Sequence, residues 1–83
     1  MARSTPISLE NRDKYIALGL NIAYYRKIEG MTQEQFAEKA GISRTYLGSI
    51  EAYSVVKTFS LEVLFNIANA LGVPASKLLE FRD

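Results

Sequence analysis

Cysteine and histidine are both absent from this 83-residue sequence. Without cysteine the chain can form no disulfide and has no thiol nucleophile, and without either residue it lacks the usual ligands of zinc. We therefore expect no metal site and no cofactor. The lack of cysteine also fits a reducing compartment.

Long apolar runs are missing as well. No stretch approaches the about 20 apolar residues that a membrane-spanning helix requires, and residues 1–6 hold no apolar run typical of a signal sequence. We therefore expect a cytoplasmic protein. The carboxylates are scattered over the surfaces of the predicted helices and are not clustered with nucleophilic groups. An enzymatic activity is therefore not expected.

An excess of one charge is a further absence. Ten basic and nine acidic residues give a formal net charge of +1. Nucleic-acid binding draws much of its affinity from neutralised phosphates, so this balance argues neither for nor against such a partner. If the target is DNA, one copy of the chain is expected to bind weakly. Two copies on a two-fold site then become the expected arrangement.

What is present is an apolar fraction of 48%, distributed at helical spacing. A chain of this length and content builds one core, so we expect one domain. Caps and glycines between the apolar segments predict an all-α domain of five short helices. The predicted helices run from Asp13 until Gly30, from Gln33 to about Ala40, from Arg44 to about Ala52, from Leu61 until Gly72, and from Pro74 to Phe81.

The domain is predicted to cover residues 13–83, preceded by a flexible arm over residues 1–12, which are polar and show no period. The first predicted helix carries a second apolar stripe, formed by Ile16, Leu20 and Tyr24. One small core does not need this stripe, which indicates an extra contact surface.

A sharp turn joins the second and third predicted helices. Thr32 begins a capping box, and Gly41 tolerates the positive φ that ends the second helix. Ser43 caps the third helix, and the small side chain of Ala37 suits a close approach between two steeply crossing helices. These signals predict a helix-turn-helix unit over about 33–52.

One face of the third predicted helix is left for a partner. Leu47 and Ile50 are expected to face the core, so the opposite face is exposed and carries mostly short side chains. A helix that reads base edges in the major groove needs such a face, because bulky side chains would hold its backbone away. The exposed residues are Ser43, Arg44, Thr45, Gly48 and Ser49.

These features occur together in one known family. Residues from about 15 to 81 resemble the lambda-repressor-like (Xre-type) helix-turn-helix regulators, most strongly in the stretch MTQEQFAEKAGISRTYL that starts at Met31. The small, glycine and apolar positions agree in register with the family. Residues 67–73 are similar to the family's fourth helix and its exit. Within the family, Arg44-Thr45-Tyr46 followed by Ile50-Glu51 resembles the controller proteins of restriction-modification systems.

The resemblance implies a sequence-specific transcriptional regulator that binds double-stranded DNA as a homodimer, with the helix from about 44 to 52 in the major groove. Gln33 would contact a phosphate, the alternative being a solvated first-turn residue. Arg44 would read guanine through O6 and N7, the alternatives being a phosphate contact or a plain surface position. The implied DNA contacts are Thr32, Gln33, Ser43, Arg44, Thr45, Tyr46, Ser49, Lys57 and Thr58.

Two further expectations concern packing. The resemblance implies a partly buried ion pair between Arg26 and Glu51, which would join the first helix to the end of the third. A homodimer would use the fourth and fifth predicted helices, with Phe65, Leu79 and Phe81 as apolar anchors. The alternative is that each of these three side chains is buried in the core.

One segment departs from the family pattern. A glycine usually stands where this chain has Tyr53, so the loop over 53–58 must take another path. The alternative function is a protein-interaction or antitoxin-like module that uses the same fold with an idle DNA face. Salt dependence distinguishes the two, because DNA binding weakens steeply as salt rises and apolar association does not.

Overall fold

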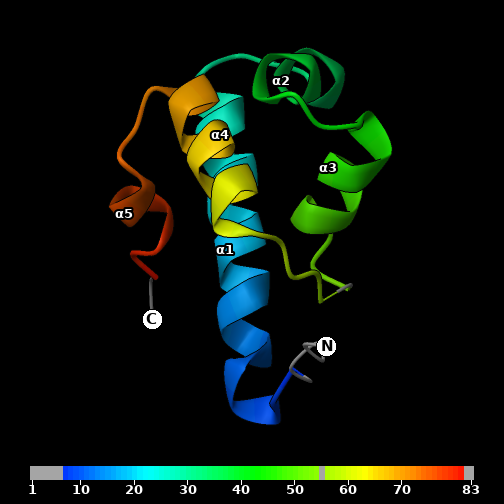
Figure 1. The fold of residues 1–83 in the computed structure, drawn as a ribbon, viewed down its shortest axis with the longest axis vertical. Helices are drawn as coiled ribbons and strands as arrows, with labels where there is room; N and C mark the ends of the chain where they lie inside the picture. Colours follow the sequence, from blue (N-terminus) through cyan, green and yellow to red (C-terminus); the bar gives the residue numbers. More distant parts are fainter. Residues whose placement is uncertain (1–6, 55, 82–83) are drawn as a thin grey trace.

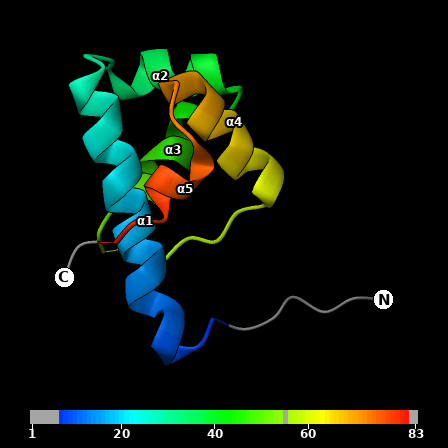
Figure 2. The ribbon, with the colours of Figure 1, turned by 90° about the vertical axis from the view of Figure 1, so that its left-hand side faces the viewer.

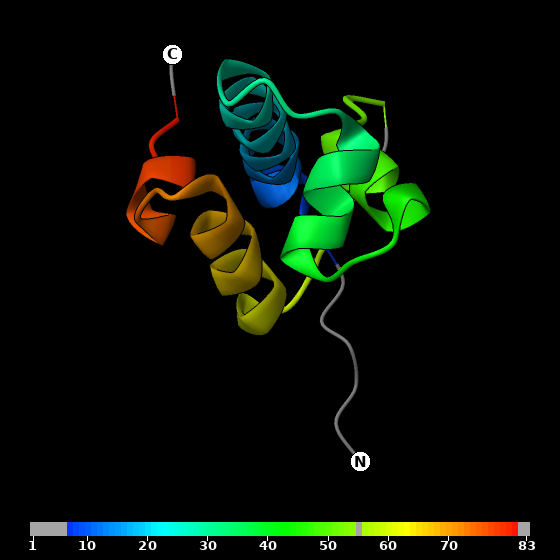
Figure 3. The ribbon, with the colours of Figure 1, turned by 90° about the horizontal axis from the view of Figure 1, so that it is seen from above.

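The computed structural model describes residues 7–54 and 56–81, and in that part of the chain the regular structure is entirely α-helical. In Figures 1 and 3, α1 and α4 form the middle of the molecule, with α3 on one side and α5 on the other. The predicted all-α, five-helix architecture is confirmed. The helices are α1 (Leu9–Ile28), α2 (Gln33–Ala40), α3 (Arg44–Glu51), α4 (Leu61–Leu71) and α5 (Ala75–Leu78).

The core receives a fully buried side chain from every helix. The largest of them are Ile22 from α1, Phe36 from α2, Leu47 from α3, Ile67 from α4 and Leu78 from α5. A single helix cannot cover its own apolar face and must pack against other elements. The five helices therefore depend on one shared core.

The turn between α2 and α3 has the predicted geometry. The Thr32 hydroxyl accepts a hydrogen bond from the Gln35 N–H at 3.0 Å, and the Gln35 side chain accepts one from the Thr32 N–H at 2.9 Å. Gly41 ends α2 at a φ of 74°, and the Ser43 hydroxyl accepts from the Tyr46 N–H at 2.9 Å. The helix-turn-helix unit therefore begins and ends within one residue of the predicted positions.

α1 and α3 approach each other closely at Gly19. A Cβ atom at this position would collide with the backbone carbonyl oxygen of Ile50. Packing therefore requires glycine here, although its backbone is ordinary helix. The contact sets the end of α3 against the middle of α1.

α1 begins at Leu9, four residues before the predicted start at Asp13. The Ser8 hydroxyl caps it by accepting from the Asn11 N–H at 3.3 Å. Residues 9–12 are exposed, so no apolar period marks this turn in the sequence. Figures 1 and 2 show this end of α1 extending beyond the other helices.

The predicted flexible arm over residues 1–12 therefore divides in two. Residues 1–6 lie outside the described residues, and residues 9–12 belong to α1. The prediction was wrong for the helical part, because the cap at Ser8 and not the first apolar residue sets where the helix begins.

α5 ends at Leu78, short of the predicted end at Phe81. The side-chain amide of Asn21 on α1 donates to the carbonyl oxygens of Leu78 at 2.9 Å and of Glu80 at 3.1 Å. A longer helix would need the Leu78 carbonyl for its own backbone bonds. These two bonds to α1 instead stabilise the chain after α5 in a non-helical path.

Candidate nucleic-acid interface

The outer face of α3 carries the short side chains that the sequence predicts. Arg44 and Thr45 are exposed, and Gly48 and Ser49 are half-buried. The opposite face packs inward through Leu47 and Ile50 together with Glu51. α3 lies at the edge of the molecule in Figures 1 and 3, so this face is open to a partner.

Three hydroxyl groups near this face already have partners within the chain, those of Thr32, Ser43 and Ser49. Those of Thr32 and Ser43 accept from backbone N–H groups at the starts of α2 and α3. The Ser49 hydroxyl donates to the Tyr46 carbonyl oxygen at 2.7 Å. The Thr32 and Ser43 hydroxyls keep a proton for donation, whereas Ser49 keeps accepting capacity. Thr45 is also exposed on this face.

A buried ion pair joins α1 to the end of α3, as predicted. Arg26 Nε lies 2.8 Å from one carboxylate oxygen of Glu51, and Arg26 Nη2 donates to the other at 2.9 Å. The third nitrogen of Arg26 donates to the Met31 carbonyl oxygen at 2.8 Å. The pair therefore also holds the turn that leads into α2.

Gln33 belongs to this network. Its side-chain amide donates to the Glu51 carboxylate at 2.9 Å, so the first turn of α2 is tied to the last turn of α3. The sequence predicts that Gln33 contacts a phosphate or is solvated, and its spacing gives no signal for this bond to Glu51. One amide proton and the side-chain carbonyl oxygen of Gln33 remain for another partner.

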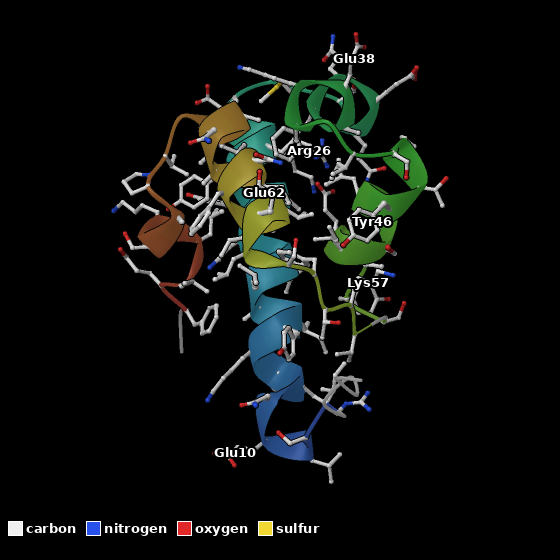
Figure 4. The ribbon with its side chains drawn as sticks, in the orientation of Figure 1. Glu10, Arg26, Glu38, Tyr46, Lys57 and Glu62 are labelled. Atoms are coloured by element: carbon white, nitrogen blue, oxygen red, sulfur yellow. The ribbon has the colours of Figure 1, made fainter. Side chains whose placement is uncertain are left out.

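The loop after α3 is tied to α3 by a cation–π contact. The Lys57 ammonium lies 5.1 Å from the centre of the Tyr46 ring. Figure 4 shows both side chains at the edge of the molecule where α3 lies. The contact fixes a positive charge beside the outer face of α3, and Thr58 is exposed next to it.

Arg44 and Lys57 are cations without an acidic partner in the part of the chain that the structure describes. The ion pairs there are the buried Arg26–Glu51 pair and a surface pair of Lys77 and Glu80 at 3.9 Å. Arg44 and Lys57 are therefore the positive charges that the α3 face presents to a partner.

The three candidate dimer residues all lie at the surface. Phe65 on α4 is 47% exposed, and Leu79 and Phe81, which follow α5, are 49% and 38% exposed. α5 lies on the opposite side of the molecule from α3 (Figure 3). The second apolar stripe of α1 is partly exposed too, at Leu20 and Tyr24.

Residues 7–54 and 56–81 also bear on two other kinds of site, a metal site and a membrane-spanning helix. No group of three or more histidine, cysteine, aspartate or glutamate residues there is placed to hold a metal ion. None of the helices described is both long and apolar enough to cross a membrane.

Comparison with known proteins places this arrangement in a family. The helix-turn-helix family model matches residues 22–78. Control protein C.SmaI of Serratia marcescens is 40% identical over 62 residues, which cover 75% of this chain and 71% of that protein. The HTH-type transcriptional regulator SinR of Bacillus subtilis is 35% identical over 63 residues, which cover 76% of this chain and 56% of SinR.

Solved structures agree with these relatives. The restriction-modification controller protein C.AhdI of Aeromonas hydrophila superposes with a TM-score of 0.74 at 26% identity, covering 80% of this chain and 97% of that one. SinR, solved in complex with DNA, superposes with a TM-score of 0.69 at 35% identity, covering 76% and 98%. The model match, the curated relatives and the shared fold together show that this chain belongs to the helix-turn-helix family.

Proposed function

We propose that this protein is a transcriptional regulator that binds a specific sequence of double-stranded DNA by inserting α3 into the major groove. The observation that carries the proposal is the outer face of α3, where Arg44 lacks an acidic partner among the described residues and its neighbours are short. The related SinR is an HTH-type transcriptional regulator solved in complex with DNA, which supports the same use of this fold.

The proposed contacts divide into base reading and backbone binding. Arg44 reads guanine through O6 and N7, and Thr45 contacts the adjacent base edge, with Ser43 and Ser49 beside them. Phosphates are bound by the remaining proton donors of Thr32 and Gln33 at the start of α2. Tyr46, Lys57 and Thr58 bind the DNA backbone on the side of α3 away from Thr32 and Gln33.

We further propose that the protein acts as a homodimer in the cytoplasm and without a cofactor. A net charge of +1 gives one copy little electrostatic affinity for DNA, whereas two copies on an inverted repeat add their contacts. Phe65, Leu79 and Phe81 supply an apolar surface for the second copy. Leu79 and Phe81 follow α5, which lies on the opposite side of the molecule from α3, so a dimer formed through this end would leave the α3 face free for DNA.

Selection of binding sites from random double-stranded DNA tests the function. The wild type is expected to enrich an inverted repeat whose half-sites lie about 10 base pairs apart, each with a guanine at one fixed position. Arg44→Ala is expected to lose the preference for that guanine. Lys77→Ala, which removes a cation from α5, serves as the control and should enrich the wild-type sequence. A wild type that enriches no sequence would reject the proposal.

A protein-interaction module is the second candidate, favoured by the exposed Leu20 and Tyr24 on α1. A partner held by this apolar surface would bind almost independently of salt, whereas DNA binding would weaken steeply between 50 and 200 mM salt, by roughly tenfold or more. A salt titration of DNA binding alongside the selection separates the two candidates.

A further inference from the structure

Gly48 lies in the interior of α3, where neither the backbone conformation nor the packing of this chain requires glycine. Among the described glycines, the positive φ values occur at Gly30, Gly41 and Gly72. Gly48 has an ordinary helical backbone, which any residue can adopt. Its conformation therefore does not explain its identity.

Packing does not explain it either. A Cβ atom on Gly48 would meet only the Arg44 side chain, at 3.5 Å from Nη1, which is an ordinary van der Waals contact with the end of a flexible group. At Gly19, by contrast, a Cβ would collide with the rigid backbone of Ile50. The two helical glycines thus differ, because only Gly19 is required by a neighbour within the chain.

Glycine is also unfavourable at this place. After proline it is the least favourable residue in the interior of a helix, and α3 has only eight residues. Alanine at position 48 would stabilise α3 and would fit the available space. The advantage of glycine must then lie in contact with another molecule.

The position of Gly48 on α3 indicates which contact this is. It lies one turn after Arg44 and three residues after Thr45, so the three share the outer face. The guanidinium of Arg44 lies beside the bare backbone of Gly48. The face therefore combines one position without a side chain with one long and one short side chain.

We propose that Gly48 determines DNA sequence specificity, because its missing side chain lets the α3 backbone approach the base edges closely enough for Thr45 to reach them. This inference rests on the proposed function. A side chain at position 48 would hold α3 farther from the bases. Thr45 is too short to bridge the added distance, whereas the long side chain of Arg44 still reaches its guanine, and phosphate contacts through Lys57 persist.

Two variants test this, Gly48→Ala and Gly48→Leu, with Asn69→Leu as a matched control that adds a leucine to the exposed side of α4. Each is measured for its melting temperature and for its affinity for the duplex that the wild type selects. Affinity is also measured for duplexes with single base changes and at several salt concentrations. Both glycine variants should melt at or above the wild-type temperature, because alanine and leucine favour helix.

Affinity for the selected duplex should fall in the order glycine, alanine, leucine, by about tenfold for Gly48→Leu. The variants should lose base preference at the positions next to the guanine that Arg44 reads. That guanine should still be preferred, and the salt dependence of binding should be unchanged. Asn69→Leu should bind as the wild type does.

Two results would overturn the inference while leaving the proposed function intact. The first is a Gly48→Leu variant that binds the selected duplex with wild-type affinity and selectivity. The second is a loss of affinity accompanied by a lower melting temperature, which would mean that glycine serves the fold. A wild type that selects no sequence would overturn both proposals, so the two failures are distinguishable.

Discussion

The Glu51 carboxylate accepts hydrogen bonds from three N–H groups, two of Arg26 and one of Gln33. The Arg26 and Glu51 side chains are 10% and 5% exposed. Removing charges from water is unfavourable unless they are well paired, so the net gain from such a pair is small while the loss of one partner is severe. The pair and the Gln33 bond thereby join α1, α2 and α3.

Glu51→Ala is expected to lower the free energy of unfolding by about 3 kcal/mol, because it leaves the Arg26 guanidinium buried without its counter-ion. The double variant with Arg26→Ala should lose less than the sum of the two single variants. Urea unfolding followed by circular dichroism measures both. Glu80→Ala breaks only the surface pair with Lys77 and should leave the urea midpoint unchanged. An unaltered midpoint for Glu51→Ala would contradict the prediction.

Lys57→Gln is expected to weaken DNA binding without changing the selected sequence. The substitution removes a charge that Tyr46 holds beside α3, and one lost phosphate contact should reduce the slope of log affinity against log salt by about one. Fluorescence anisotropy at several salt concentrations measures this slope. Lys77→Gln removes a charge on the far side of the molecule and provides the control. A change in base preference would instead assign Lys57 a base contact.

Tyr46→Phe and Tyr46→Ala separate the roles of the ring and the hydroxyl. The phenylalanine variant keeps the ring beneath the Lys57 ammonium, so it should lose only a direct phosphate contact of the hydroxyl. The alanine variant should lose the positioning of Lys57 as well and bind more weakly. Equal affinities for the two variants would show that the ring does not position Lys57. The same anisotropy titration reports both.

At the level of helices, α1 and α3 approach each other so closely at Gly19 that no side chain fits between them. Gly19→Ala places a methyl group against the Ile50 carbonyl, which is backbone and cannot turn aside. The gain in helix propensity should be outweighed, with a net loss of about 1–3 kcal/mol in the free energy of unfolding. Gly48→Ala makes the same chemical change without a collision and should not destabilise the fold. Thermal melts of the two variants compare them directly, and equal stabilities would reject this interpretation.

The boundaries of α2, α3 and α4 could be predicted from the sequence because the signals for them are local. Thr32, Ser43 and Ser60 cap the starts, while Gly41 and Gly72 take positive φ values where helices end. Each of these signals operates within a few residues, so it can be recognised from the local sequence without knowing the fold.

What the sequence could not predict depends on contacts between residues far apart in the chain. Asn21 ends α5 through two carbonyl groups, Gly19 admits the backbone of Ile50, and Gln33 bonds to Glu51. No spacing rule marks these pairs. The sequence therefore predicts the exposed side chains of the candidate site and the Arg26–Glu51 pair, but not the Gln33 bond or the Gly19 contact that also hold α3 in place.

For the whole molecule, the arrangement of surfaces yields a prediction about assembly. Phe81→Glu places a charge within the proposed apolar surface and is expected to shift the protein from dimer to monomer at micromolar concentration. DNA binding should weaken as a consequence, because each half-site is then bound separately. Size-exclusion chromatography with light scattering reports the mass.

Ile28→Glu serves as the control for this change. Ile28 is 58% exposed on α1, outside the proposed surface, so its replacement should leave the mass of the assembly unaltered. A wild type that is monomeric at the same concentration would remove the basis for the proposed dimer.

The sharing of one core by five helices has a consequence for turnover in the cell. An isolated eight-residue helix does not persist in water, so α3 exists only while Leu47 stays buried in the shared core, where α3 packs against α1 and α2. Opening the core at any point, by heat or by a protease that captures the open chain, abolishes the DNA-reading face in the same event. The concentration of active protein is then set by the balance between synthesis and the loss of folded copies. Partly active forms do not accumulate.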